Sequence, residues 1–332
     1  MEGRDSAISG SRQLNCQTKS VNIRSIITFS ALAAATAVAA SSSCTATVSG
    51  QAQASGPDRL AITLSGLAAA LDPPLSPSGS APLPTLDVTG RGLLSKIAAD
   101  PPMRFGPTAT PGVAVRFQQP NGSGTLCTVG PVVRHVGGAF DGFVTAGHCA
   151  DNDVPASLQT TSDPHRAKLL SAVTGSMVYP AGNPAKFEID SEFVMTERAS
   201  PAAVRIAGVW PVEGVLTEAA VRRLPESTTE VCYAGTVSGV VCGPLNFINN
   251  KNIAFAASAG QGNSGSAVFV VNAATDAAAL IGTVSASGGG ITVATYLEPT
   301  LERLHLTALV DPTAAASVSG DPRYSAAVSP LE

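Results

Sequence analysis

Residues 260–269, GQGNSGSAVF, place Ser264 in a run of glycine and other small residues, directly before an apolar stretch typical of a β-strand. Glycine lacks a Cβ, so it allows sharp turns and a close approach of the backbone to a ligand. Gly262 and Gly265 therefore favour a tight turn whose N–H groups can point toward a substrate carbonyl. These features make Ser264 a candidate nucleophile.

Two other segments supply the partners that a nucleophilic serine needs. FVTAGHCA puts His148 at the end of an apolar run and beside a cysteine, and FEIDSEFVMT puts Asp190 at the head of another run. A carboxylate at the edge of the core can accept the imidazole N–H, which fixes the tautomer and stabilises the imidazolium. Three acids near His148 are interpreted as loop residues, with Asp151 kept as an alternative to Asp190: Asp141, Asp151 and Asp153. The other histidines are interpreted as surface or core residues: His135, His165 and His305.

The rest of the chain predicts an all-β domain. The 32 glycines and 24 prolines favour many turns, and the abundant small and β-branched residues favour strands. Short strand-like runs recur from residue 111 onward, among them GVAVRF, SEFVMT, TEVCYAG, SAVFVV and ITVATYL. One helix is expected in EPTLERLHLTALV, where Leu301, Leu304 and Leu309 can share a buried face. The only tryptophan, Trp210, is expected in the core.

The N-terminal region predicts export. Basic residues precede the apolar run SIITFSALAAATAVAASSS, and AVA at 37–39 fits a signal cleavage site, so residues 1–39 are predicted as a basic region and signal peptide. The apolar stretch 26–40 is short compared with a membrane span of about 20 residues. Membrane attachment would require that the signal is retained or that Cys44 is lipidated, and Ser41 stands where a lipid signal normally has a bulky aliphatic residue.

Three further segments follow the signal. Residues 40–110 contain LDPPLSPSGSAPLPT and ADPPMRFGPTATP, and this composition predicts a linker, a removable pro-segment, or both. Residues 111–310 form the predicted folded domain. Residues 311–332 return to an Ala/Ser/Pro composition and are predicted to be a flexible tail.

The cysteines form two local pairs once Cys16 is assigned to the signal. Cys127 with Cys149, and Cys232 with Cys242, are predicted disulfides that close short loops in an exported protein. A zinc site would need Cys or His residues two to four positions apart, and the sequence has no such pairs, so no metal is expected. The net charge of −4, without a basic stripe, does not favour nucleic-acid binding.

Five motifs, which follow one another along the chain in the order found in that family, resemble the chymotrypsin-like serine proteases, most closely the bacterial branch that includes the streptogrisins and alpha-lytic protease. TAGHC resembles the histidine motif, and GNSGS resembles the serine motif GDSGG. VCYAGTVSGVVCG resembles the disulfide hairpin, SASGGG at 285–290 the edge strand that pairs with substrate, and TYLEPTLERL the entry to the C-terminal helix. The resemblance covers about residues 111–310.

The resemblance implies two six-stranded antiparallel barrels with the site in the cleft between them. It implies a serine endopeptidase that acts through an acyl-enzyme and needs no cofactor. Ser264 would be the nucleophile, His148 the general base and then acid, and Asp190 the orienting carboxylate. The N–H groups of Gly262 and Ser264 would form the oxyanion hole. Three further residues match positions of the substrate pocket: Ser258, Ser287 and Gly289.

Asn263 departs from the family pattern, in which an acid usually stands at this position and forms an ion pair that shapes the oxyanion loop. Glutamyl endopeptidases also carry GNSGS, so the asparagine does not argue against activity. It argues against activation through a salt bridge to a new N-terminus. The neutral Ser258 favours small or medium apolar substrate side chains, with glutamate as the alternative.

Two functions are therefore carried forward. The first is an exported, monomeric endopeptidase, secreted or at the cell surface, that acts on proteins or peptides. The second is a binding protein of the same fold whose site is assembled but idle. The presence of both Ser264 and His148 favours the first, because inactive relatives usually lose one of them.

Overall fold

The computed structural model describes residues 83–92, 104–118, 123–138, 140–150, 155–160, 167–169, 176–177 and 190–332. All of these lie in one compact unit, residues 48–332. The predictions for the signal peptide, Cys44 and residues 40–82 fall outside the described residues. In the part that is described, none of the helices has the length and apolar character to cross a membrane.

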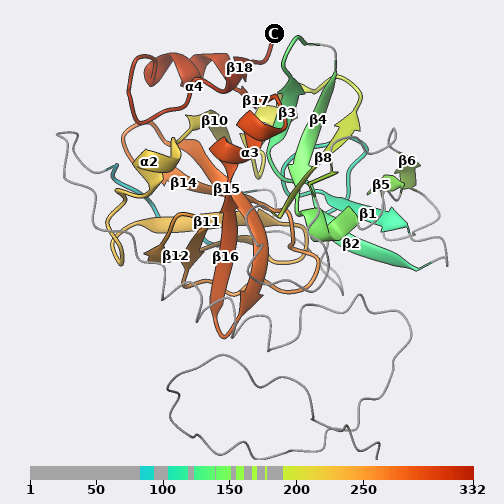
Figure 1. The fold of residues 1–332 in the computed structure, drawn as a ribbon, viewed down its shortest axis with the longest axis horizontal. Helices are drawn as coiled ribbons and strands as arrows, with labels where there is room; N and C mark the ends of the chain where they lie inside the picture. The colour runs from blue at the N-terminus through green and yellow to red at the C-terminus, as the bar shows by residue number, and fades with distance from the viewer. Residues whose placement is uncertain are drawn as a thin grey trace, which may run out of the picture. The chain divides into compact units, whose positions relative to one another are not determined.

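Six strands of the second half close into a barrel (Figure 1). Around the barrel they follow the order β11 (Glu230–Gly235), β12 (Gly239–Ile248), β13 (Asn252–Phe255), β16 (Ile291–Tyr296), β15 (Ala277–Gly288) and β14 (Ala267–Asn272). All six pairings are antiparallel, and β14 pairs with both β15 and β11, so the barrel has no open edge. Outside the barrel, β10 (Trp210–Val215) pairs with β15 and with β9 (Arg205–Ile206).

The described strands of the first half lie in two further sheets, the second of which also contains the last two strands of the chain. One has the order β2 (Gly124–Thr128), β1 (Ala114–Gln118), β5 (Ala156–Gln159) and β6 (Ala167–Leu169). The other has the order β18 (Val328–Pro330), β17 (Leu306–Val310), β3 (Val132–His135), β4 (Asp141–Thr145), β8 (Ser191–Thr196) and β7 (Ser176–Met177). The predicted all-β class is confirmed, and one of the two predicted six-stranded barrels is closed. In place of the other predicted barrel, the described residues form the two separate sheets above.

Strand β14 shows why the short apolar runs form barrel walls. All six of its residues are buried, because successive side chains point to opposite faces and each face meets a core. Phe269 and Val271 belong to the core cluster that contains Trp210, whereas Val268 and Val270 belong to a second cluster. The core position predicted for Trp210 is confirmed, and its ring lies 6.3 Å from that of Phe269.

The C-terminal helix is shorter than predicted. Helix α3 spans only Leu297–Arg303, and the backbone of His305 then adopts a φ of 52°, which a helix cannot continue through. Leu306–Val310 forms β17 instead and pairs with β3. Leu309 is therefore buried from a strand and not from a helix face. The other short helices in the described residues are α2 (Glu218–Val221), α4 (Pro312–Ser317), η2 (Gly147–Ala150) and η4 (Pro201–Val204).

The prediction of a flexible tail at 311–332 is wrong. Asp311 caps α4 by accepting hydrogen bonds from two backbone N–H groups, and β18 pairs in parallel with β17. The Ala/Ser/Pro composition does not reveal this order, because the order depends on main-chain hydrogen bonds, which any residue except proline can donate and accept.

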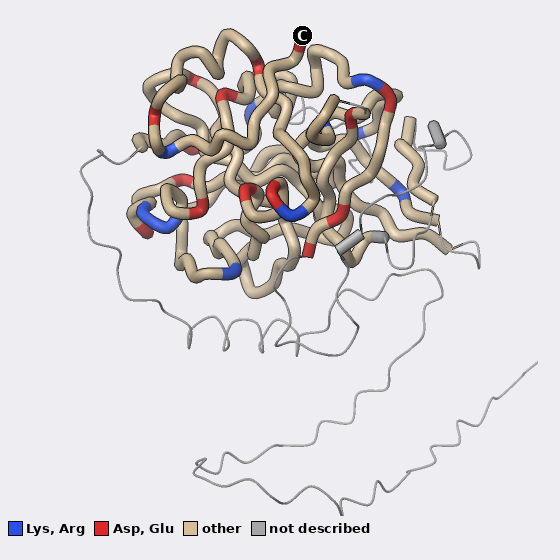
Figure 2. Tube along the Cα trace, turned by 45° about the horizontal axis from the view of Figure 1, so that its top comes forward, with Lys and Arg blue, Asp and Glu red and all other residues tan. Residues whose placement is uncertain are grey.

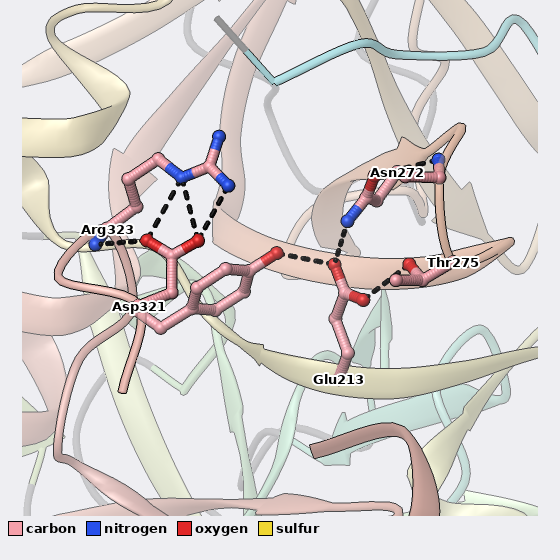
Figure 3. A network of polar contacts seen from close by, with 7 residues as sticks. Glu213, Asn272, Thr275, Asp321 and Arg323 are labelled. Atoms are coloured by element: carbon pink, nitrogen blue, oxygen red, sulfur yellow. Dashed lines mark hydrogen bonds and ion pairs between the residues drawn. The ribbon is translucent and has the colours of Figure 1, made fainter. Parts of the chain in front are cut away.

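A buried polar network also holds the last residues in place (Figure 3). The buried carboxylate of Glu213 on β10 accepts hydrogen bonds from the Tyr324 hydroxyl, the Asn272 amide and the Thr275 hydroxyl. Burial, together with this carboxylate, raises the pKa of the Tyr324 hydroxyl well above its usual value. Neutral donors satisfy the Glu213 oxygens, so this one carboxylate on β10 links the C-terminal segment to the end of β14 and to the turn that follows it.

Charged positions in the described residues are scattered along the trace and do not gather in one basic stretch (Figure 2).

One charged residue, Asp141, is not the loop acid that its sequence context indicated. It is the first residue of β4, it is buried, and its carboxylate accepts hydrogen bonds from Arg134 Nε at 2.7 Å and from the Ala199 N–H at 2.8 Å. This ion pair ties β3 to β4, the strand that leads to His148.

We expect the Arg134–Asp141 pair to contribute stability that is lost in acid. Burial by itself would raise the pKa of Asp141, but the Arg134 hydrogen bond and the Ala199 N–H outweigh it and lower the pKa. The unfolded chain then takes up a proton at a higher pH than the folded protein, so this stability is complete above about pH 4 and is lost as the pH falls further. The difference in Tm between wild type and Asp141→Asn should therefore narrow below about pH 4. A difference that stays constant down to about pH 2 would contradict this assignment.

Candidate active site

The fold brings His148 and Asp190 together through two neighbouring strands. His148 lies in η2, immediately after β4, and Asp190 immediately precedes β8. Because β4 and β8 are antiparallel, the end of the first lies beside the start of the second, with Thr145 opposite Glu192. The predicted disulfide from Cys149 to Cys127 on β2 is present and anchors η2.

Asp190 is buried and accepts three hydrogen bonds. Its Oδ1 accepts from the His148 backbone N–H at 2.8 Å, and its Oδ2 accepts from His148 Nδ1 at 2.8 Å and from the Ser285 hydroxyl at 2.6 Å. Burial alone would raise the pKa of this carboxyl, but the positive charge that His148 carries when protonated and the three hydrogen bonds outweigh it, so the pKa lies below its usual range. The carboxylate is therefore ionised at neutral pH.

Ser264 completes the contact chain. Its Oγ lies 2.9 Å from His148 Nε2, although the two residues are 116 positions apart in sequence. The His148 side chain is 43% exposed, so the histidine and serine meet at a surface that a substrate can reach. With Nδ1–H donated to Asp190, Nε2 is left as the acceptor for the serine proton. The three residues predicted from sequence thus form one hydrogen-bonded line.

The serine loop requires glycine at two positions. Gly262 and Gly265 have φ angles of +90° and +83°, which side chains with a Cβ rarely adopt. A Cβ on Gly265 would lie 1.9 Å from the Thr145 hydroxyl, at the end of β4. The Ser266 N–H donates to the Asn263 carbonyl at 3.1 Å and closes the turn around Ser264. The oxyanion role of the Gly262 and Ser264 N–H groups stays a prediction.

Asn263 explains why no acid stands before the serine. Its side chain is fully buried; Oδ1 accepts from the N–H groups of Val237 and Ser238, at 3.1 and 3.2 Å. Its Nδ2 donates to the Ser238 hydroxyl at 2.7 Å and to the Gly260 carbonyl at 3.1 Å. A carboxylate cannot donate, so an amide is the group that satisfies this site. The side chain joins the serine loop to the turn of the β11–β12 hairpin, residues 236–238.

That hairpin carries the second predicted disulfide. Cys232 on β11 lies directly opposite Cys242 on β12, and the two are bonded. The disulfide thus closes the hairpin whose turn contacts Asn263.

The three predicted pocket residues lie in two neighbouring segments. Ser258 is exposed, and its carbonyl accepts from the Tyr233 hydroxyl at 2.6 Å. The Ser287 hydroxyl accepts from the Ala259 N–H at 3.0 Å, so β15 is bonded to the segment that precedes the serine loop. Gly289 lies in the turn between β15 and β16, with a φ of +61°. Their contact with substrate stays a prediction.

Ser285 is the site residue that sequence reasoning missed. It lies at the start of SASGGG, where the resemblance indicates an edge strand and assigns pocket positions to Ser287 and Gly289 but no role to Ser285, and its hydroxyl donates the third hydrogen bond to Asp190. Asp151, Asp153 and His165 lie outside the described residues. His135 packs on Phe140, with ring centroids 4.8 Å apart.

No protein-family model and no curated protein matches the chain. Among solved structures it resembles the Nocardiopsis protease NAPase, at 20% identity over 60% of this chain and 97% of that chain, with a TM-score of 0.44. It also resembles Thermobifida fusca Protease A, at 21% identity over 61% of this chain and 99% of that chain, with a TM-score of 0.45. A third similar structure is a glutamic acid specific serine protease that uses a histidine triad in substrate binding, at 18% identity over 60% and 99%, with a TM-score of 0.44. At these identities the likeness concerns the fold alone.

Proposed function

We propose that the protein is an exported serine endopeptidase that hydrolyses peptide bonds through an acyl-enzyme. One observation carries this proposal: the hydrogen-bonded line from Asp190 through His148 to Ser264, with distances of 2.8 and 2.9 Å. This arrangement matches the roles of nucleophile, base and orienting acid.

The geometry supports a two-step reaction. Ser264 Oγ attacks the scissile carbonyl while His148 Nε2 takes the serine proton, and the resulting imidazolium then protonates the leaving amine. The ionised Asp190 keeps the proton on Nδ1 and stabilises the imidazolium. A water molecule then attacks the acyl-enzyme while His148 takes its proton; the histidine returns this proton to Ser264 Oγ as the ester bond breaks and the acid leaves.

The developing oxyanion would be bound by the N–H groups of Gly262 and Ser264. The positive φ of Gly262 and the four hydrogen bonds of the Asn263 side chain support this role, because they fix the backbone on either side of the serine. Preorganised donors of this kind typically lower the barrier by about 3 kcal/mol.

The substrates would be proteins or peptides with a small or medium apolar side chain at the cleaved bond. The segments 257–261 and 285–292 carry no charged residue. The Ser287 hydroxyl already accepts from the Ala259 N–H and donates to the Ile291 carbonyl at 3.1 Å, which does not favour a carboxylate-binding role. The two disulfides support a secreted or cell-surface location.

A fluorophosphonate probe tests the proposal, because it reacts only with an activated serine. The full-length chain, expressed through an export route, should gain one covalent adduct in intact mass, and peptide mapping should place the adduct on Ser264. The matched Ser264→Ala variant should gain none. Failure of the secreted wild type to react would favour the idle binding protein of the same fold. Strict cleavage of a peptide library after Glu or Lys would overturn the apolar preference.

A further inference from the structure

Residues 83–92, here called the strap, pack against the closed barrel although they precede the first strand. The strap runs beside the end of β14: Thr85 forms a bridge with Asn272, and the Leu86 N–H donates to the Val271 carbonyl at 3.1 Å. The Ala273 N–H donates back to the Pro84 carbonyl at 2.9 Å.

The strap also bonds to both strands of the β11–β12 hairpin. The Thr85 hydroxyl accepts from the Glu230 N–H on β11 at 2.8 Å, and the Thr89 hydroxyl accepts from the Cys242 N–H on β12 at 2.9 Å. The Gly90 N–H donates to the Val240 carbonyl at 2.9 Å.

Val88 anchors the strap in the core. Its side chain is 1% exposed and belongs to the same core cluster as Val240 on β12 and Trp210 on β10. A segment held this way behaves as part of the barrel and not as a linker.

A second upstream segment, residues 104–110, holds the turn of the same hairpin. The Arg104 N–H donates to the Thr236 carbonyl at 3.0 Å, and the Thr236 hydroxyl and the Arg104 carbonyl are 3.1 Å apart in a hydrogen bond. The Thr236 N–H donates to the Thr128 hydroxyl at 3.1 Å, and that hydroxyl donates to the Gly262 carbonyl at 2.7 Å.

The turn is the element that fixes Asn263. Val237 and Ser238 follow Thr236 directly and supply both N–H groups that Asn263 Oδ1 accepts. Contacts therefore run without a gap from the upstream residues, through the β11–β12 hairpin, to the loop that carries Ser264.

We propose that residues 83–92 and 104–110 form a brace that stays in the active protein and positions the serine loop through the β11–β12 hairpin. This corrects the interpretation of all of 40–110 as a linker or removable segment. A maturation cut that discards the N-terminal region then lies before Leu83. The part of the inference that concerns activity rests on the proposed function; the part that concerns loop order does not.

The test replaces Val88 with aspartate in the full-length chain. A buried, unpaired carboxylate expels the strap, so amide hydrogen exchange at residues 236–238 and 262–265 should accelerate at least about tenfold, measured well below Tm. Fluorophosphonate labelling of Ser264 should slow by at least about tenfold. Leu86→Asp is the matched control, because the Leu86 side chain is 36% exposed on the same strap, and it should behave as wild type. Val88→Ile should retain wild-type exchange and labelling.

Two results would overturn the brace. One is a lower Tm for Val88→Asp with unchanged exchange and labelling at the serine loop, which would make the strap a stabiliser only. The other is an active secreted form whose N-terminus lies beyond Gly92. If Val88→Asp does not fold, Thr85→Val removes the acceptor of the Glu230 N–H and is judged by the same readouts. If the probe does not label Ser264 in wild type, the proposed function has failed, but the hydrogen-exchange measurement still tests whether the brace orders the serine loop.

Discussion

Asp190→Asn is expected to slow fluorophosphonate labelling and peptide hydrolysis by about 10⁴-fold while the protein stays folded. The carboxylate accepts the Nδ1–H of His148, which leaves Nε2 free to take the Ser264 proton. An asparagine amide can present an N–H to Nδ1 instead, and the proton then moves to Nε2, where it blocks proton transfer. Slow or absent labelling of Ser264 together with an unchanged circular dichroism spectrum would show that the variant is folded and that the reactivity of the serine is what has been lost.

Ser285→Ala is the matched control for this substitution. It removes one of the three hydrogen bonds to Asp190 but leaves the carboxylate and its contact with His148 Nδ1. Its effect on labelling should therefore be smaller by orders of magnitude. If Asp190→Asn instead labels within about tenfold of wild type, Asp190 is not the orienting acid, and Asp151 becomes the residue to test.

The parts of the site that were predictable from sequence are those with short, local signatures. His148, Asp190 and Ser264 each lie at the edge of an apolar run, where a strand ends or begins, and the structure joins all three. The two disulfides were also predictable, because each pair is close in sequence and the predicted export would place the cysteines in an oxidising environment.

The parts that were missed depend on partners far away in sequence. The apolar residues of Leu306–Val310 are compatible with either a helix or a strand. The segment forms a strand because it pairs with β3 and because the positive φ of His305 ends the preceding helix. The strap and the C-terminal segment look like loose linkers in composition. Their order comes from main-chain hydrogen bonds to β12, β14 and β17, which leave no mark on the composition of the segment itself.

Asn263→Asp is expected to reduce the free energy of unfolding by about 3–5 kcal/mol at neutral pH and to abolish labelling of Ser264. The side chain is fully buried, and its Nδ2 donates to the Ser238 hydroxyl and the Gly260 carbonyl. A carboxylate oxygen at that position would face the Gly260 carbonyl oxygen without a proton between them. The loop would keep the two bonds to the N–H groups of Val237 and Ser238 but would carry a buried charge.

The pH dependence of this variant identifies the cause. Burial without a cation raises the pKa of the introduced carboxyl in the folded state above its unfolded value, so the folded protein binds the proton more tightly. The deficit in stability should then be largest at about pH 8 and shrink toward about pH 4, where the protonated carboxyl donates one hydrogen bond. Ser238→Ala adds no charge and removes one acceptor, so its deficit should be about 1 kcal/mol and independent of pH. Wild-type stability for Asn263→Asp at neutral pH would mean that a cation reaches the introduced carboxylate and that the amide network is not what holds the serine in place.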